Sequence, residues 1–284
     1  MIDTAAAIAS PQYIAFDREP SEPTPAGGRA WAVRGQNYTL DYVEAAPGDA
    51  LTCGADVEHV VIIPDEDVDI EIETHGEAVR VTDAAVVVLP PGPARILAQR
   101  ATRFIHLVDT RDASTVGRGL NAARYQEPDP RVAKLVVATR AQPSTGPEVF
   151  LLSAHPPQPG RFGTIFRSET FLVNILDPQQ GPRDPDRLSP HHHDDFEQGS
   201  LAIDGEWIHH LRTPWGPKRP EWRDDEHRAI GSPSLTIIPP PVIHTSEAIG
   251  QGLNRLIDIF CPVRKDFVDQ GWVLNSDSYT DTPE

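Results

Sequence analysis

The stretch that decides the fold of this chain is SPHHHDDFEQGSLAIDGEW, residues 189–207. Three consecutive histidines stand before a run of alternating apolar and polar residues, the pattern of a half-buried β-strand. Alternate side chains of an extended segment point to the same face, so His191 and His193 can point one way and His192 the other. Two imidazoles on one face are half of a metal site. The alternative is an exposed hydrophilic loop, because short histidine motifs often match by chance.

Two further pairs of segments indicate an internal repeat. VVVLPPGPAR (86–95) is similar to LTIIPPPVIH (235–244), and DVEHVVIIPDED (56–67) is similar to DFEQGSLAIDGE (195–206). The paired segments begin 149 and 139 residues apart and follow the same order. This predicts a duplicated unit whose second copy carries about ten extra residues in a surface loop. We place those residues in 209–231, as either a lid over a pocket or a solvated loop whose tryptophans pack on the barrel.

The repeat supplies a third imidazole, because His244 follows the second copy's proline-bounded strand. Together these positions resemble the motifs of the cupins. The first cupin motif is His-x-His, three or four residues, Glu or Gln, six residues and Gly, matched here by His191, His193, Gln198 and Gly205. The second motif ends in Pro-x-Gly-x-x-His, matched by residues 239–244 with Pro241 in place of the glycine.

The resemblance covers both repeats and implies an all-β chain of two cupin barrels, each a double-stranded β-helix or jelly roll, with few short helices. The abundance of proline (29) and glycine (20) among short β-branched runs agrees with many strands joined by turns. Helical patterns occur near the middle of the chain, at 118–126 and 129–140. The expected organisation is an extended arm (1–28), an N-terminal barrel (29–111), a linker (112–145) and a C-terminal barrel (146–284).

The resemblance also implies a metal centre in the C-terminal barrel, held by His191, His193, Gln198 and His244. Glu197 is the alternative to Gln198, and neighbouring side chains of a strand leave opposite faces. The expected cofactor is one divalent transition metal (Fe, Zn, Mn, Ni or Cu), since imidazole suits all of them. If the amide is the ligand, four neutral donors leave the full +2 charge on the ion, which favours an anionic or enolate-like ligand.

The first repeat lacks this set. Thr52 and Gly54 stand at the positions of the two leading histidines, His59 at that of Gln198, and Arg95 at that of His244. One imidazole and one guanidinium do not hold a transition metal, so the N-terminal barrel is predicted to be metal-free, with a structural or dimer-forming role. The alternative is that Arg95 clamps a carboxylate in a second pocket.

Three residues are candidates for catalysis. His210, which with His209 follows the strand after Gly205, is a candidate acid or base at the barrel mouth or half of an exposed pair. Arg167 alternates with apolar residues in GTIFRSETFLVNIL (163–176), so it faces either the pocket and an anionic substrate or the outer sheet surface. Glu197 is the third candidate.

The net charge and the number of cysteines limit the classes of partner and the cellular compartment that we expect. Lys and Arg total 25 against 42 Asp and Glu, a net charge of −17, which repels phosphate backbones and anionic lipid. We therefore expect neither nucleic acid nor a membrane as a partner. Only Cys53 and Cys261 occur, too few for a disulfide framework, and no signal peptide is apparent, so the cytoplasm is the expected compartment.

The expected function is a metal-dependent cupin enzyme that acts on a small, oxygenated, anionic molecule through a metal-bound enolate. The outcome is either dioxygenation or isomerisation/elimination. The alternative is a non-catalytic cupin that binds a metal or small ligand. A homodimer is expected by resemblance, with IDIFCPV (257–263) as an intersubunit strand.

Overall fold

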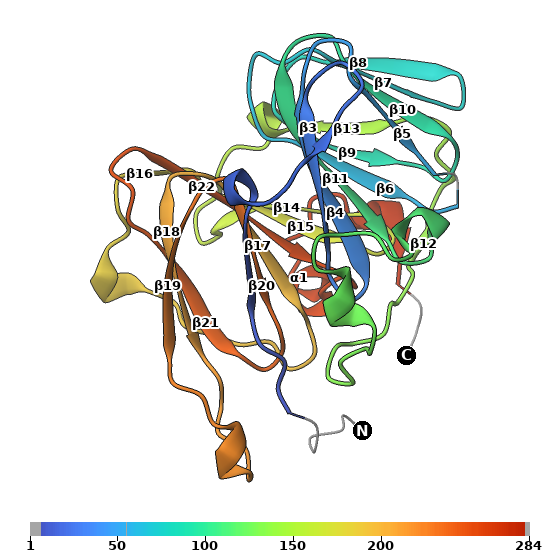
Figure 1. The fold of residues 1–284 in the computed structure, drawn as a ribbon. Coiled ribbons are helices and arrows are strands. Elements are labelled where there is room, and N and C mark those ends of the chain that lie inside the picture. Colours follow the sequence, from blue (N-terminus) through green and yellow to red (C-terminus); the bar gives the residue numbers. More distant parts are fainter. Residues whose placement is uncertain (1–6, 55, 282–284) are drawn as a thin grey trace.

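The structure is a computed structural model that describes residues 7–54 and 56–281. Strands dominate it, and the described residues contain one α-helix, α1 (Lys265–Asp269). The predicted all-β class is confirmed. The strands form two lobes, each built from one large and one small antiparallel sheet (Figure 1).

The first barrel lies in the blue-to-green lobe of Figure 1. Its large sheet runs in the order β13 (Glu148–Leu151), β9 (Ala85–Leu89), β6 (His59–Ile63), β11 (Thr102–Asp109), β4 (Tyr38–Ala45), β3 (Arg29–Arg34) and β2 (Glu22–Pro23). Its small sheet runs in the order β5 (Ala50–Cys53), β10 (Ala94–Ala98), β7 (Ile70–Thr74) and β8 (Glu77–Val81).

The second barrel repeats this plan. Its large sheet runs in the order β1 (Gln12–Ala15), β20 (Ser234–Ile238), β17 (Gln198–Asp204), β22 (Leu253–Phe260), β15 (Leu172–Leu176) and β14 (Gly163–Arg167), with β16 (Gln179–Gln180) paired to β22. Its small sheet runs in the order β19 (Glu226–Gly231), β18 (Glu206–Arg212) and β21 (Ile243–Ala248). A separate pair joins β12 (Thr139–Arg140) to β23 (Tyr279–Thr280).

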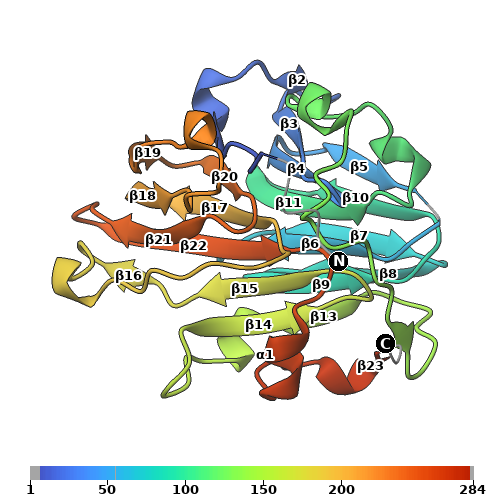
Figure 2. The same cartoon turned by 90° about the horizontal axis from the view of Figure 1, so that it is seen from below.

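The chain exchanges edge strands between the two lobes. β1, from the expected N-terminal arm, pairs antiparallel with β20 of the second barrel. β13, which follows the expected linker, pairs with β9 of the first barrel. Figure 2 shows β13 and β14 consecutive in the chain but extending into different lobes. Each large sheet is thus completed by a segment that lies next to the other barrel in the sequence.

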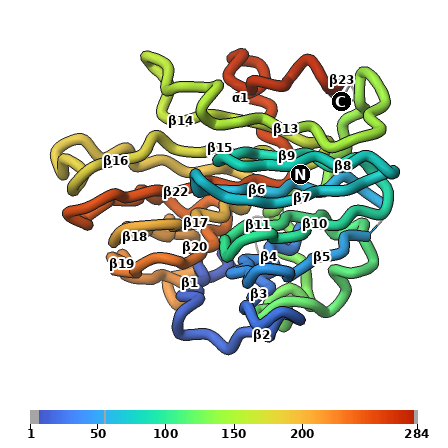
Figure 3. Tube along the Cα trace, turned by 90° about the horizontal axis from the view of Figure 1, so that it is seen from above, coloured from blue at the N-terminus to red at the C-terminus, as the bar shows by residue number. Residues whose placement is uncertain are grey.

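The two large sheets are buried on both faces. Val60 and Ile62 of β6 belong to an apolar cluster shared with Leu201 and Ile203 of β17, which joins the barrels back to back (Figure 3). The alternate residues of these strands point into their own barrels. The register places Gln198 and His59 at equivalent inward positions, since Gln198 pairs with Phe260 and Ile238 while His59 pairs with Val108 and Leu89.

The middle of the chain differs from the sequence prediction. Residues 118–126 contain only a 3-10 turn, Ala122–Tyr125, and 129–140 contain no helix. None of the described helices has the length and apolar character needed to cross a membrane.

The segment 209–231 forms most of a hairpin rather than one long loop. β18 and β19 pair from Glu206↔Gly231 to Leu211↔Glu226, and the residues between them extend past the barrel (Figure 1). At the tip, Trp215 and Trp222 stack on each other with ring centroids 4.5 Å apart and are exposed. The tryptophans therefore do not pack on the barrel as the solvated-loop alternative expected.

The expected intersubunit strand, 257–263, does not lie at an edge. Most of it belongs to β22, which pairs with β17 on one side and β15 on the other. With both rows of backbone groups already paired, this strand has no free edge for a second subunit. The homodimer itself stays a prediction.

Candidate metal centre

Three histidines meet at one end of the second barrel. The ligand atoms of His191, His193 and His244 all lie within 4.8 Å of one another. His191 and His244 form an antiparallel backbone bridge, with N–O distances of 3.0 and 2.7 Å, which joins the loop before β17 to β21. His192 points outward to Asp194. The predicted alternation therefore holds, although the triplet lies in a loop with a single bridge rather than in a regular strand.

Gln198, at the start of β17, completes the group. Its side-chain Nε2 donates to Ser200 Oγ and Asp258 Oδ1, each at 2.9 Å. These bonds turn its carbonyl Oε1 toward the histidines, 2.8 Å from His193 Nε2 and 3.1 Å from His244 Nε2. The structure therefore brings together all four predicted ligands.

The protonation pattern fits a cation. His244 Nδ1 donates to the carbonyl of Val242 at 2.9 Å, and His191 Nδ1 donates to that of Ser189 at 2.9 Å. In a neutral imidazole whose Nδ1 carries the proton, Nε2 has a free lone pair and can only accept a hydrogen bond or bind a cation. His244 Nε2 and Gln198 Oε1 are then two acceptors facing each other at 3.1 Å. Such a contact is repulsive unless a cation lies between them, so these residues fit a divalent metal.

Burial keeps two of the histidines neutral. Burial, followed by the charge of Arg264, lowers the pKa of His193 to about 3. Burial likewise lowers the pKa of His244 to about 4. His191 is exposed and opens the cluster toward solvent. The group can thus receive a metal with its lone pairs free at neutral pH.

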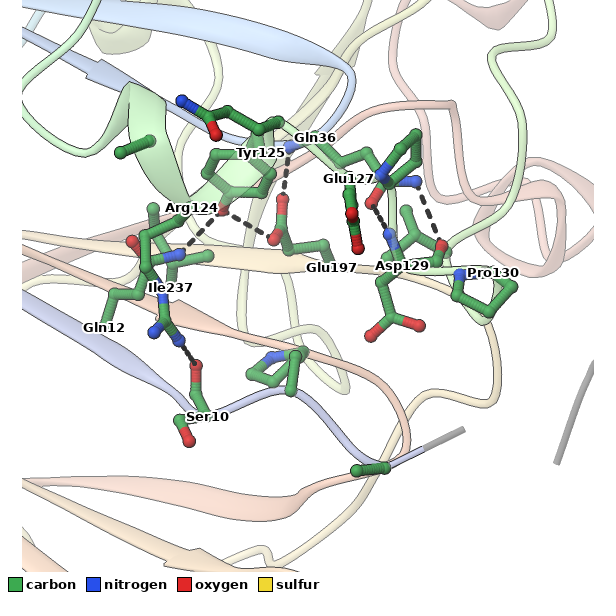
Figure 4. A pocket seen from close by; sticks show the side chains of 17 residues that line it. Ser10, Gln12, Gln36, Arg124, Tyr125, Glu127, Asp129, Pro130, Glu197 and Ile237 are labelled. Carbon is green, nitrogen blue, oxygen red and sulfur yellow. Dashed lines mark hydrogen bonds between the residues drawn. The ribbon is translucent and has the colours of Figure 1, made fainter. Parts of the chain in front are cut away.

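Glu197 points away from the histidines. Its carboxylate accepts hydrogen bonds from the backbone N–H of Gln36 at 2.7 Å and the hydroxyl of Tyr125 at 2.8 Å (Figure 4). It lines a cavity of about 490 Å³ between the barrels, and burial raises its pKa to about 7. The geometry therefore places Gln198 rather than Glu197 at the histidines, and it does not bring Glu197 to them as a catalytic group.

Arg167 does not reach the cluster. Two strands, β22 and β15, lie between β17 and β14, so three strand spacings of about 4.8 Å separate it from Gln198. Its buried guanidinium pairs with Asp281 at 2.7 Å and lies over the ring of Tyr279. Arg167 thus ties β14 to the C-terminal segment.

His210 also lies elsewhere. It points to the partly exposed side of β18, where Nδ1 lies 2.7 Å from His227 Nδ1 and Nε2 lies 2.8 Å from Glu247. Its neighbour His209 points into the barrel instead, and its ring is buried. His209 Nδ1 lies 2.8 Å from Ser246 Oγ, while its Nε2 has no partner.

The second barrel has a polar interior. Several of its inward side chains carry a buried polar atom without a hydrogen-bond partner in the protein: Asn174, His209, Ser234 and Thr236. Burying polar groups without partners is costly, so an interior of this kind is suited to polar ligands or water.

The first barrel holds another group of ligand-type side chains. Cys53, His59 and His106 are all buried, and their ligand atoms also lie within 4.8 Å of one another. The described residues thus contain two candidate metal sites, one of three histidines and one of two histidines and a cysteine.

No protein-family profile matches the chain, and no curated protein is similar to it in sequence. Solved structures do match it. Oxalate decarboxylase of Lactobacillus farciminis, in a formate complex, aligns over 91% of this chain and 88% of its own, with a TM-score of 0.61 and 13% identity. A putative glyoxylate-induced protein of Pseudomonas aeruginosa aligns over 91% and 92%, with a TM-score of 0.58 and 14% identity. A mutant of Bacillus subtilis oxalate decarboxylase aligns over 98% and 89%, with a TM-score of 0.52 and 14% identity.

The chain has the cupin fold, in a two-barrel arrangement. The resemblance predicted from the His-x-His and proline motifs is confirmed at the level of the fold. At 13–14% identity, the likeness says nothing about the reaction of this bicupin.

Sequence reasoning gave too little weight to two residues of this bicupin. His209 was considered beside His210, but only the phase of β18 decides which of the two points inward. Arg264 was not considered. It follows β22, lies over the rings of Phe260 and Phe267, and is the cation whose charge lowers the pKa of His193 and His244.

Proposed function

We propose that this bicupin is a metal-dependent enzyme acting on a small, oxygenated, anionic molecule in the second barrel. The observation that carries the proposal is the meeting of three imidazoles and the Gln198 carbonyl above an interior of unpartnered polar side chains. A purely structural metal site would not need such an interior, because apolar side chains fill a barrel at lower cost.

His191, His193, Gln198 and His244 would hold one divalent transition metal. When bound, it would supply Lewis acidity to adjacent substrate oxygens and, if redox-active, a route to O2. All four donors are neutral, so the site keeps a positive charge that favours an anion. Arg264, whose guanidinium is paired with Asp266, also acts on His193 and His244 through its positive charge.

The remaining inward side chains would orient the substrate and handle its proton. The hydroxyls of Ser234 and Thr236 are free to donate to substrate oxygens. The unpartnered Nε2 of His209 is available to take or return a proton. The reaction class we favour starts with removal of a proton beside a carbonyl or carboxyl group and ends in dioxygenation, or in isomerisation or elimination.

The solved structures with this fold support the substrate class by analogy alone. One is an oxalate decarboxylase in complex with formate and another a glyoxylate-induced protein, both names that point to small oxygenated acids.

A non-catalytic binding protein is the second candidate. It is favoured by the positions of His210 and Glu226, which bond to Glu247 and Tyr13 rather than approaching the histidines. The β18–β19 hairpin therefore brings neither of these acid–base groups to the candidate centre.

The test starts with metal analysis of protein purified without a histidine tag, in which one metal per chain should be lost when His244 is replaced by alanine. Iron-loaded protein is then offered diketones, catechols, keto acids and dicarboxylic acids, with oxygen uptake and proton NMR as readouts. Uptake of O2 supports dioxygenation, and product without uptake supports isomerisation or elimination. Stoichiometric metal and ligand binding with no turnover of any compound would favour the binding protein.

Neighbouring histidines provide a matched pair of variants. His209→Asn should lower kcat/KM by about 10²–10⁴-fold, the range of general acid–base catalysis, whereas His210→Asn should leave it unchanged. Equal effects of the two substitutions would contradict the role given to His209.

A further inference from the structure

We propose that Cys53, His59 and His106 form a second metal site, inside the first barrel, that takes a thiophilic divalent ion such as Zn²⁺. The site is independent of the function proposed for the second barrel, because it shares no residue with that cluster. It would be structural, since all three side chains are buried.

The three side chains come from three strands that converge inside the barrel. His59 Nδ1 lies 2.8 Å from His106 Nε2, and Cys53 Sγ lies 3.6 Å from the same Nε2. Zinc held tetrahedrally, with bonds of about 2.0–2.3 Å, separates nitrogen from sulfur by about 3.6 Å and two nitrogens by about 3.3 Å. The sulfur already lies at the required separation, and the two imidazoles need to part by about half an ångström.

In each imidazole, the ring nitrogen that points away from the proposed metal faces a carboxylate. His106 Nδ1 donates to Asp41 Oδ2 at 2.9 Å, so in the neutral imidazole that a metal requires, Nε2 carries the lone pair that faces the thiol. His59 Nε2 lies 3.9 Å from Asp112 Oδ2, and neither atom has a hydrogen-bond partner. A carboxylate on the outer nitrogen of a histidine is the arrangement that orients metal-bound imidazoles. When the ion binds Nδ1 of His59, the ring proton moves to Nε2, where Asp112 can accept it.

This set is not a copy of the second barrel's centre. The register puts His59 at the position of Gln198 and His106 at that of Asp258. Cys53, however, stands opposite Ala94 of β10, one residue along from Thr52, which stands at the position of His191. The prediction of a metal-free first barrel considered only positions 52, 54, 59 and 95. The inward side chain of β5 is Cys53, so that prediction missed the thiol.

A nucleophilic Cys53–His106–Asp41 arrangement is a weaker interpretation. In such a group the imidazole nitrogen serves the thiol alone, whereas His106 Nε2 is also 2.8 Å from His59 Nδ1. Three donors around one point are the geometry of a metal site.

Cobalt is the test probe, because a thiolate bound to Co²⁺ gives a charge-transfer absorption in the near ultraviolet that imidazole ligands do not. Reduced, metal-free full-length protein is titrated with Co²⁺ and then with Zn²⁺. We expect the band to report one thiolate-bound Co²⁺ per chain, while the cluster of the second barrel takes up a further Co²⁺ that gives no such band, and we expect the band to disappear when Zn²⁺ displaces the metal. Absence of the band in wild-type protein saturated with Co²⁺ overturns the proposal without any variant.

The second cysteine supplies a matched control. Cys53→Ser should abolish the band and lower the metal content by one per chain, whereas Cys261→Ser should leave both unchanged, because Cys261 lies in the core shared by the two barrels. His244→Ala should leave the band intact while removing the other metal, so failure here is distinguishable from failure of the proposed function. A band that survives Cys53→Ser, or that Cys261→Ser removes, contradicts the site.

Discussion

At equivalent places in the two barrels, β17 pairs Ser200 with Thr236 of β20, while β6 pairs Val61 with Val87 of β9. The first barrel is filled at these inward positions by aliphatic side chains. The second carries hydroxyls, one of which has no partner in the protein. The same register therefore supports two interiors, one that stabilises the fold and one that costs stability.

The difference indicates a division of labour after duplication. An apolar interior excludes polar ligands, so the body of the first barrel contributes stability, and its ligand-type groups are confined to the end that holds Cys53, His59 and His106. The second barrel has polar rather than aliphatic side chains at the corresponding inward positions, so it lacks this apolar packing. It can do so because its outer face is buried against the first barrel in a shared core.

The largest expected effect is on metal binding, and it comes from replacing one residue at the end of each barrel by alanine, in two separate variants. His244→Ala should reduce metal affinity of the second barrel by at least tenfold and abolish any turnover, because it removes one of the three imidazoles. Arg95→Ala, at the position that the sequence repeat aligns with His244 but whose side chain is exposed, should change neither. Metal analysis after gel filtration checks both variants, and an equal loss of metal in both would remove the distinction between the barrels.

The next effect concerns Phe16, which directly follows β1 and contacts both barrels. Phe16 donates its backbone N–H to Pro233 of the second barrel at 3.1 Å. Its ring stacks on Tyr42 of the first barrel, with centroids 4.6 Å apart. Phe16→Ala should therefore lower the free energy of unfolding by about 3–5 kcal/mol, the usual cost of removing a fully buried phenylalanine.

Urea unfolding measures this cost, and Phe162→Ala is the control, because Phe162 is 51% exposed and should cost less than half as much. If the two variants lose the same stability, the N-terminal strand does not join the barrels in the way the contacts indicate.

A pair of substitutions at one equivalent position should shift stability in opposite directions. Thr236→Val removes a buried hydroxyl that has no partner and should raise the free energy of unfolding by up to about 1 kcal/mol. Val87→Thr introduces such a hydroxyl into the apolar barrel and should lower it by about 1–3 kcal/mol. Urea unfolding of both proteins is the measurement, and a loss of stability in Thr236→Val would show that its hydroxyl is satisfied in the folded protein.

The sequence predicted the features that depend on local pattern. The spacing of His191, His193 and Gln198 lies within eight residues, and His244 ends a strand that the repeat identifies. Alternation along a strand also predicted that Glu197 and Gln198 leave opposite faces, as they do in the structure, while the spacing to Gly205 favoured Gln198.

Features that depend on contacts between distant segments were not predictable. β1 pairs with a strand more than two hundred residues away, and its sequence, QYIA, carries no sign of that partner. Cys53, His59 and His106 belong to three strands and match no spacing motif. Arg167 and His210 were uncertain for a related reason, because pattern alone does not fix which face of a strand is inward when both neighbours are polar or both faces are buried.

The smallest expected effect is that of replacing Glu197, the neighbour of Gln198 at the start of β17. Glu197→Gln keeps the shape of the side chain, and its single carbonyl oxygen can still accept from the Gln36 N–H, while the amide NH2 takes the place of the oxygen that accepted from the Tyr125 hydroxyl. We expect unchanged metal content and a stability change within about 1 kcal/mol. Gln198→Ala, by contrast, should lower metal affinity at the second barrel, because it removes the oxygen that lies 2.8 Å from His193 Nε2.

Isothermal titration of the two metal-free variants with Zn²⁺ distinguishes these effects. Loss of the second-barrel metal in Glu197→Gln but not in Gln198→Ala would reverse the assignment of the fourth ligand, and with it the argument that the centre carries an undiminished positive charge.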